Sequence, residues 1–255
     1  MSQPSPVTFP SLTNPASGAD PACSNVTSRI AFEVTINIVE RTRILSSILE
    51  IGVVPVVRTA SAEGAILAVE AVYRGGIRAA EITMTVPGAI RALEKLADRF
   101  GDKIMLGAGT VLDPETARTC MLAGAQFFVT PSLNLKTIEM VRRYSMVILP
   151  GALTPTEVVH AWEAGADAVK IFPASAVGGP KYIRALKGPL PHIEMIPTGG
   201  VNVENTAEFL KAGACAVAVG GELIDSKTIA EGRYEVFERR AGLFLAEVAK
   251  ARSNA

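Results

Sequence analysis

The chain has 255 residues, and its 25 basic and 25 acidic side chains leave no net charge. It is 49% hydrophobic but only 5% aromatic, and it holds 22 glycines and 16 prolines. A chain of this length can bury a large core, and its balanced charge excludes the strongly basic field that suits nucleic acids or anionic membranes. We therefore expect a small-molecule substrate, with neither a nucleic acid nor a membrane as partner.

The first 35 residues are expected to form a leader outside the folded domain. Residues 1–28 contain five prolines, six serines and three threonines, a composition that rarely builds a core. No apolar stretch is long enough for a membrane span, and the first basic residue is Arg29, unlike a secretion signal. A cytoplasmic protein is expected. Residues 30–38 alternate like a strand but run into a helical pattern, so their assignment stays open.

The cysteines and histidines are too widely spread to indicate a disulfide framework or a metal site. Cys23, Cys120 and Cys215 form no CxxC pair, which indicates structural thiols in a reducing compartment. His160 falls in a helical segment and His192 in a proline-flanked loop. We expect both histidines at the surface, and neither a metal nor a cofactor.

A repeated glycine followed by an apolar run predicts the architecture. It occurs in RGGIRAAEI, LAGAQFFV, EAGADAVKI and KAGACAVAV, at Gly76, Gly124, Gly165 and Gly213. A glycine in this position ends a helix and leads into a strand. Four further apolar runs complete the pattern: VVPVVR, IMLGAG, MVILPG and MIPTGG. Eight strands in alternation with helices are therefore predicted.

Two folds bury such apolar strands on both faces, a doubly wound sheet and a barrel. Eight regular units in about 200 residues favour a single (β/α)8 TIM barrel over residues 36–255. Helices are predicted to begin at Asp113-Pro114, Thr154-Pro155 and Asn202. A helix over about residues 41–51 would plug the barrel floor, and a last helix over about 230–250 would close the chain.

Two charged residues fall where strands of such a barrel end, the edge that carries its chemistry. Lys170 lies in the apolar run GADAVKIF, where an unpaired charge costs several kcal/mol. Burial disfavours the charged form of an amine, and the neutral amine is a nucleophile toward ketones. Glu81 lies in AAEITMTVP with Thr83 on its own side, and burial there would raise the carboxyl pKa toward that of a general acid and base. A structural Lys170–Glu81 ion pair fits the same pattern, so both interpretations stay open.

Glycine-rich strand ends are the third feature. GAGTVLDPE and PTGG expose backbone N–H groups, which bind carboxylate or phosphate oxygens. The pairs Gly199-Gly200 and Gly220-Gly221 are the stronger signal, because barrels of this kind usually hold a phosphate after their last two strands.

Six motifs in this combination and order resemble one family. EITMTVP, GAGTVLDPE, FFVTPSLN, LPGALTPTE, VKIFPAS and IPTGGVN are similar to motifs of the 2-keto-3-deoxy-6-phosphogluconate and 4-hydroxy-2-oxoglutarate aldolases. The resemblance covers about residues 41–250. Family members are class I aldolases on a (β/α)8 barrel and typically form trimers, so the resemblance implies a homotrimer.

The resemblance also implies a reaction and its residues. Lys170 would form a Schiff base with the ketone of a 2-keto-3-deoxy sugar acid or a 4-hydroxy-2-oxo acid, and Glu81 would shuttle protons. The C3–C4 bond would break to give pyruvate and an aldehyde. The substrate carboxylate is assigned to Arg58, Thr110 and Pro131. The distal or phosphate end of the substrate is assigned to Thr198, Gly199, Gly200, Gly220, Gly221 and Ser175.

The sequence departs from the family pattern at two places. Thr85 stands where some members carry an arginine that clamps the carboxylate, while others carry it at the end of the first strand, as Arg58 does here. Glu222 follows Gly221, where members often have a serine. An inward-pointing anion there would weaken a bound phosphate, so phosphorylated and unphosphorylated substrates both stay open.

Three other functions are weighed against this one. A sugar-phosphate isomerase or epimerase would need a second carboxylate or a histidine, and both histidines are badly placed. A metal-dependent pyruvate aldolase would need several carboxylates at the strand ends. A non-catalytic keto-acid or sugar-phosphate binding barrel would not need both Lys170 and Glu81.

Overall fold

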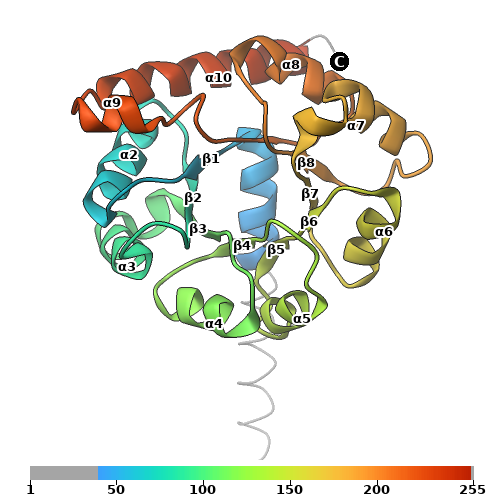
Figure 1. The fold of residues 1–255 in the computed structure, drawn as a ribbon, viewed down its shortest axis with the longest axis horizontal. Coiled ribbons are helices and arrows are strands. Elements are labelled where there is room, and N and C mark those ends of the chain that lie inside the picture. Colours follow the sequence, from blue (N-terminus) through green and yellow to red (C-terminus); the bar gives the residue numbers. More distant parts are fainter. Residues whose placement is uncertain (1–39, 254–255) are drawn as a thin grey trace, which may run out of the picture. The chain divides into compact units, whose positions relative to one another are not determined.

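The computed structural model describes residues 40–253, which form a mixed α/β fold with parallel strands (Figure 1). The expected leader, Cys23 and the strand-like residues 30–38 lie outside the described part of the chain. All eight predicted strands are present. The fifth is interrupted at Pro150, which has no backbone N–H to donate.

The strands belong to two curled parallel sheets rather than to one continuous sheet. One has the order β5-β4-β3-β2-β1-β9 and the other the order β6-β7-β8. An isolated parallel bridge joins Thr198, just after β8, to Ala218 of β9. The strands are β1 (Val53–Val57), β2 (Ala79–Thr83), β3 (Met105–Gly109), β4 (Phe127–Val129), β5 (Val147–Leu149), β6 (Gly151–Ala152), β7 (Val169–Ile171), β8 (Met195–Pro197) and β9 (Val217–Val219).

The helices that follow the strands lie outside them (Figure 1). They are α2 (Ala62–Arg74), α3 (Ala89–Phe100), α4 (Pro114–Leu122), α5 (Leu135–Arg143), α6 (Pro155–Glu163), α7 (Pro180–Lys187), α8 (Val203–Lys211), α9 (Ser226–Ala230) and α10 (Glu235–Ser253), with two short 3-10 helices, η1 (Gly101–Lys103) and η2 (Ala174–Val177). The prediction for the last helix was wrong at its start, because a turn at Gly232, where φ is 69°, separates α9 from α10.

The predicted helix starts are confirmed by their caps. The side chains of Asp113, Thr154 and Asn202 each accept a hydrogen bond from a backbone N–H in the first turn of the helix that follows. The four glycines of the repeat have φ between 94° and 103°, a region that β-carbons disfavour. Helix ends and strand starts are therefore placed as the repeat predicts.

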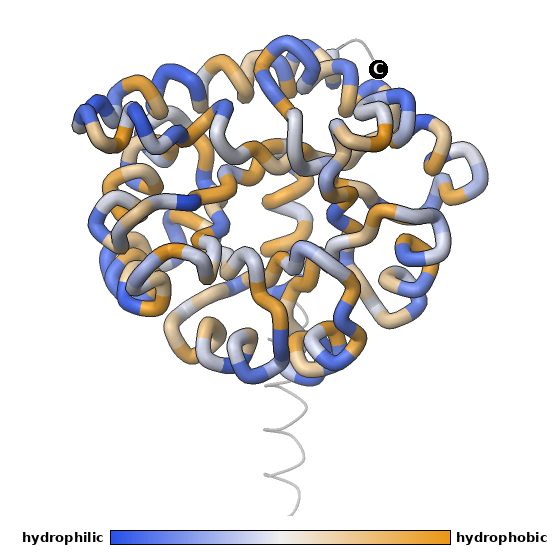
Figure 2. Tube along the Cα trace, in the orientation of Figure 1, coloured by the Kyte–Doolittle hydropathy of each residue, from blue (hydrophilic) through white to orange (hydrophobic). Residues whose placement is uncertain are grey.

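A helix over residues 40–51 lies within the ring of strands, as predicted for the floor (Figure 1). Its Ile44 and Ile48 are buried against a cluster of apolar side chains from in and around the strands. Figure 2 colours much of this helix and of the strands around it as hydrophobic. The other buried residues of this inner cluster lie in the strands or directly before them: Val54, Val56, Ala79, Met105, Phe127, Val129, Val147, Leu149, Ala168, Ile196, Ala216 and Ala218.

Polar contacts fix the same helix to the strands. Arg41 Nε donates to the buried carboxylate of Asp167 at 2.9 Å, and Ile148 N donates to its other oxygen at 2.8 Å. Both oxygens of a buried carboxylate are thus paired, which offsets the cost of burying it. The helix and its ion pair with Asp167 occupy the end of the ring at which the strands begin. A binding site is therefore expected at the other end, where the strands finish.

Candidate active site

Lys170 and Glu81 meet inside the ring of strands, although they are 89 positions apart in sequence. Lys170 is the middle residue of β7 and Glu81 the middle residue of β2. The distance from Lys170 Nζ to Glu81 Oε1 is 3.8 Å, and the residues are 5% and 0% exposed. The ammonium position also lies 5.2 Å from the centre of the Phe172 ring. An amine and a carboxyl group are therefore held together away from solvent.

The carboxyl group of Glu81 is poorly stabilised as an anion. Among the described residues neither of its oxygens has a hydrogen-bond partner, and 3.8 Å to Lys170 is beyond hydrogen-bond length. Burial raises the pKa of Glu81, and the positive charges of Lys170 and Arg58 oppose that rise. A structural salt bridge would be shorter and better paired. The geometry suits a carboxyl group that takes and releases a proton.

Two glycines of the GAGT motif are explained by packing. A β-carbon on Gly109 would lie 2.8 Å from Glu81 Oε1, and one on Gly107 would lie 2.3 Å from the Phe127 ring. The sequence interpretation assigned this motif to the binding of oxyanions through backbone N–H groups. In the structure its glycines make room for the Glu81 carboxyl group and for the Phe127 ring.

Thr110, the last residue of that motif, has an unusual backbone conformation. Its φ is 54°, a region that costs a β-branched residue roughly 1–3 kcal/mol. Such strain collects at functional sites, and Thr110 follows directly after β3. Pro131, also assigned to the carboxylate, follows β4 and packs against Gly151, where a β-carbon would lie 2.4 Å from the Pro131 carbonyl carbon.

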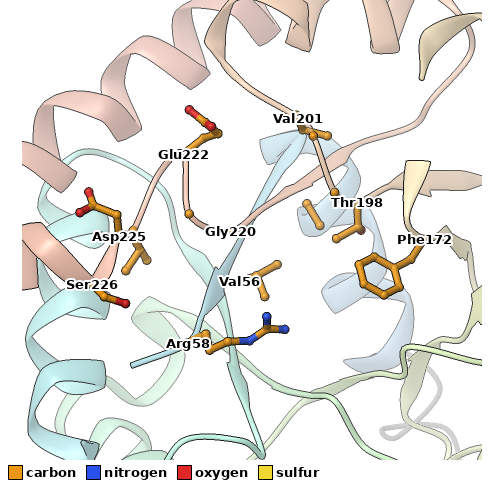
Figure 3. Close-up of a pocket in the computed structure, with 14 residues that line it drawn as sticks. Val56, Arg58, Phe172, Thr198, Val201, Gly220, Glu222, Asp225 and Ser226 are labelled. Carbon is orange, nitrogen blue, oxygen red and sulfur yellow. The ribbon is translucent and has the colours of Figure 1, made fainter. Parts of the chain in front are cut away.

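A cavity of about 520 Å³ opens at the strand ends (Figure 3). Lys170 and Glu81 do not line it; they line a small internal pocket that shares Thr198 and Ala218 with the cavity. Five of the residues assigned to the distal end line the cavity, whereas Ser175 contacts Gly200 from outside that lining. Arg58, assigned to the carboxylate end, lines the same cavity, whereas Thr110 and Pro131 do not. The lining consists of Val56, Arg58, Phe172, Thr198, Gly199, Gly200, Val201, Ala218, Gly220, Gly221, Glu222, Ile224, Asp225 and Ser226.

Two acidic residues stand at the rim of this cavity. Figure 3 shows the carboxylate of Glu222 turned away from Arg58 and Thr198. Asp225 caps α9 and accepts a hydrogen bond from Arg240 at 2.7 Å. Burial opposes its ionisation, but hydrogen bonds from Thr228 and Arg240 together lower the pKa of Asp225 to about 2. Glu222 therefore belongs to the cavity lining, but its carboxylate does not face Arg58 or Thr198.

Sequence reasoning did not single out Phe172, which contacts both parts of the site. Its ring faces Lys170 Nζ and forms a wall of the cavity next to Thr198. The signal was present, because residues two apart in a strand share a face and Phe172 follows Lys170 by two.

The described cysteines and histidines do not line the cavity or the pocket of Lys170 and Glu81. Burial raises the pKa of Cys120 and of Cys215 to about 12, as structural thiols require. His160 and His192 are exposed, as predicted. Within residues 40–253 no three histidine, cysteine or acidic side chains gather into a possible metal site. No helix in that range is long and apolar enough to cross a membrane.

The chain matches the family model described as KDPG and KHG aldolase over residues 44–239. It is 39% identical to the 2-dehydro-3-deoxy-6-phosphogalactonate aldolase of Escherichia coli over 67% of this chain and 83% of that protein. It is 32% identical to the KHG/KDPG aldolase of the same organism over 74% and 89% of the two chains.

A solved structure shows the same likeness. The KDPG aldolase of Legionella pneumophila, with pyruvate captured at low pH as a covalent carbinolamine intermediate, superposes with a TM-score of 0.70. The two chains are 30% identical, and the match covers 75% of this chain and 92% of the other. The family match, the relatives and the buried lysine and glutamate lead to one conclusion: the chain belongs to the KDPG and KHG aldolase family and is an aldolase, a carbon–carbon lyase.

Proposed function

We propose that this aldolase is a class I enzyme that cleaves the C3–C4 bond of a 2-keto-3-deoxy sugar acid or a 4-hydroxy-2-oxo acid through a Schiff base on Lys170. The observation that carries the proposal is the buried Lys170–Glu81 pair, 3.8 Å apart, in a pocket that shares Thr198 and Ala218 with the cavity of about 520 Å³. The Legionella relative captured with pyruvate as a covalent carbinolamine supports covalent chemistry of this type.

The reaction begins with the neutral amine of Lys170. Its lone pair attacks the C2 carbonyl carbon of the substrate, and the resulting carbinolamine loses water to give a protonated imine. The amine lies in surroundings that exclude water, and the Phe172 ring next to Nζ stabilises the positive charge of the iminium. Glu81 supplies and removes the protons that these steps need.

Bond cleavage then uses Glu81 as a base. The carboxylate takes the proton of the C4 hydroxyl, the C3–C4 bond breaks, and its electron pair moves into the imine to form an enamine. C4 leaves as an aldehyde, either glyceraldehyde 3-phosphate or glyoxylate. Protonation of the enamine at C3 and hydrolysis of the imine release pyruvate and restore the free amine. Every proton is returned, so no external reductant or oxidant is needed.

Substrate binding is divided between two groups of residues. Arg58, Thr110 and the Pro131 backbone are proposed to hold the carboxylate, and the strained φ of Thr110 supports its place in the set. The distal end is proposed to lie against the residues around the two glycine pairs. Gly220 and Gly221 have no atoms within 4 Å of where a β-carbon would lie, so their faces are open to a ligand. The distal residues are Thr198, Gly199, Gly200, Gly220, Gly221 and Ser175.

We further propose that the described part of the chain belongs to one domain, residues 36–255, closed as a (β/α)8 barrel. Two contacts support closure: Lys170 N of β7 donates at 2.9 Å to the oxygen of Pro150, the residue between β5 and β6, and a bridge joins Thr198, just after β8, to Ala218 of β9. A homotrimer and a cytoplasmic location are proposed by analogy with the family alone.

Borohydride trapping tests the Schiff base. Reduction of the protein with pyruvate present is expected to add one pyruvyl group to the peptide that contains Lys170, because borohydride reduces an imine to a stable amine. Lys170→Met is expected to lose the adduct. The matched control is Lys181→Met, which removes an exposed lysine of α7 and is expected to keep it. Peptide mass mapping reads the result, and absence of any adduct in the unmodified protein would refute the proposal.

The substrate is tested at Glu222. Because its exposed carboxylate faces away from Arg58 and Thr198, Glu222→Gln is expected to raise kcat/KM for a phosphorylated sugar acid by only about two- to fivefold. kcat/KM for 4-hydroxy-2-oxoglutarate, whose distal end is not a phosphate, serves as the control and should change less. A rise of a hundredfold or more with the phosphorylated acid would show that Glu222 repels it directly.

A further inference from the structure

Thr83 lies on the same side of β2 as Glu81 and is fully buried. Its hydroxyl oxygen is 3.1 Å from the backbone oxygen of Val57 and 2.8 Å from the hydroxyl oxygen of Thr85. A carbonyl oxygen only accepts hydrogen bonds, so the single proton of the Thr83 hydroxyl points to Val57. Thr85 must then be the donor to Thr83. The two hydrogen bonds therefore run in one direction, from Thr85 to Thr83 to the Val57 oxygen, and are called the hydroxyl relay below.

The hydroxyl relay ends on the peptide group that directly precedes Arg58. Val57 and Ile82 are the last pair of the β1–β2 ladder, so Arg58 is the first residue beyond it. Val54 and Val56 belong to the inner cluster, and the alternation of a strand continues that inward face to Arg58. The long side chain of Arg58 is exposed and lines the cavity. Its direction therefore depends on how firmly the end of β1 is held.

We infer that Thr83 is a positioning residue for Arg58: its hydroxyl holds the end of β1 so that the guanidinium faces the bound carboxylate. The inference rests on the proposed function, in which Arg58 binds that carboxylate. Thr85 acts one step further away, because its hydroxyl orients the proton of Thr83. Thr85, which stands where some family members carry an arginine, would therefore act through its hydrogen bond to Thr83.

The test measures the pyruvate concentration that gives half-maximal borohydride trapping at Lys170. Thr83→Val keeps the size and shape of the side chain but cannot hydrogen-bond to Val57. It is expected to raise the half-saturating pyruvate concentration by about tenfold, with the maximal trapped fraction unchanged. Thr83→Ser restores the hydroxyl and is expected to stay within about twofold of the unmodified protein. Thr85→Val, at an exposed position, is expected to show a smaller rise.

A double-mutant cycle separates positioning from general damage. Arg58→Ala alone is expected to weaken pyruvate saturation strongly. If Thr83 acts through Arg58, Thr83→Val is expected to add less than about twofold in the Arg58→Ala background. The same factor in both backgrounds, or no effect of Thr83→Val at all, would overturn the inference. Thermal unfolding followed by circular dichroism verifies that each variant is folded.

Failure of the underlying mechanism gives a different result. If the unmodified protein forms no adduct at Lys170 at any pyruvate concentration, the Schiff-base proposal fails, and the role of Thr83 fails with it. If the adduct forms normally and only the cycle is additive, the mechanism stands and Thr83 is merely structural.

Discussion

Glu81→Gln is expected to lower kcat by about 10²- to 10⁴-fold, the usual contribution of a positioned acid and base. The amide has the shape of the carboxyl group but cannot accept the proton of the C4 hydroxyl. The amine of Lys170 is unchanged, so trapping with pyruvate and borohydride should still label it, although more slowly because imine formation loses its proton shuttle. Steady-state kinetics and adduct mapping on the same variant read the two effects separately.

Two outcomes would contradict this role. Near-normal turnover would remove Glu81 from the mechanism. Loss of the adduct even after prolonged incubation, together with loss of turnover, would indicate that the carboxyl group mainly holds Lys170 in place. A separate measurement, the pH dependence of stability, tests whether the pKa of Glu81 is raised in the folded protein. Burial raises the pKa of Glu81 above its ordinary value of 4.5, so the native state binds this proton more tightly than the unfolded state does.

The sign of that dependence is fixed. The stability that protonation of Glu81 contributes is fully present below pH 4.5. It is lost as the pH rises through the higher pKa that Glu81 has in the folded protein. The amide of the Glu81→Gln variant does not titrate. The free energy of unfolding of the unmodified protein, relative to that variant, is therefore expected to fall as the pH rises from about 4.5. Urea unfolding of both proteins across this range measures it, and a constant difference would show that the native pKa is not raised.

Gly151→Ala is expected to disrupt the side of the site that is proposed to bind the substrate carboxylate. A β-carbon there would lie 2.4 Å and 2.5 Å from the carbonyl carbon and oxygen of Pro131, and 2.6 Å from Ser132 N. These are backbone atoms, so the whole turn after β4 must move. Gly151 is also the register partner of Lys170. We expect a stability loss of about 1–3 kcal/mol and a rise of about tenfold or more in the half-saturating pyruvate concentration.

Gly242→Ala is the matched control for this substitution. Gly242 lies in α10, is exposed, and has no atoms within 4 Å of its added β-carbon. Because alanine is the better helix former, we expect a gain in stability of up to about 1 kcal/mol and unchanged pyruvate saturation. Denaturant unfolding and trapping titrations compare the two variants. If Gly151→Ala and Gly242→Ala had the same stability and the same half-saturating pyruvate concentration, the turn at Pro131 would be able to move at no cost.

Much of the fold could be predicted because local chemistry determines it. The repeat glycines that end helices, the capping residues and the apolar strand runs each depend on a few neighbouring residues. The meeting of Lys170 with Glu81 was also predictable, because both fall inside apolar strands of a parallel α/β chain. The split of the fifth strand at Pro150 and the turn before α10 were missed, since each is a local interruption inside a segment with otherwise regular periodicity.

The finer geometry of the site could not be obtained from the sequence. GAGT is compatible with anion binding, and only three-dimensional packing shows that Gly109 leaves space for the Glu81 carboxyl group. Likewise the sequence places Glu222 next to Gly221 but not the direction of its side chain. Thr83 was known to share a face with Glu81, yet its bond to Val57 depends on the register between two strands.

The floor helix over residues 40–51 has a consequence for how the protein folds. Arg41 and Asp167 are 126 positions apart, and Ile44 packs in one cluster with Ala218 of the last strand and with Ala216 just before it. Contacts between such distant segments require closure of long loops, which slows folding. The first described helix therefore cannot reach its final environment until the ninth strand is in place. During synthesis the apolar face of that helix must wait, exposed, for nearly the whole chain to emerge from the ribosome.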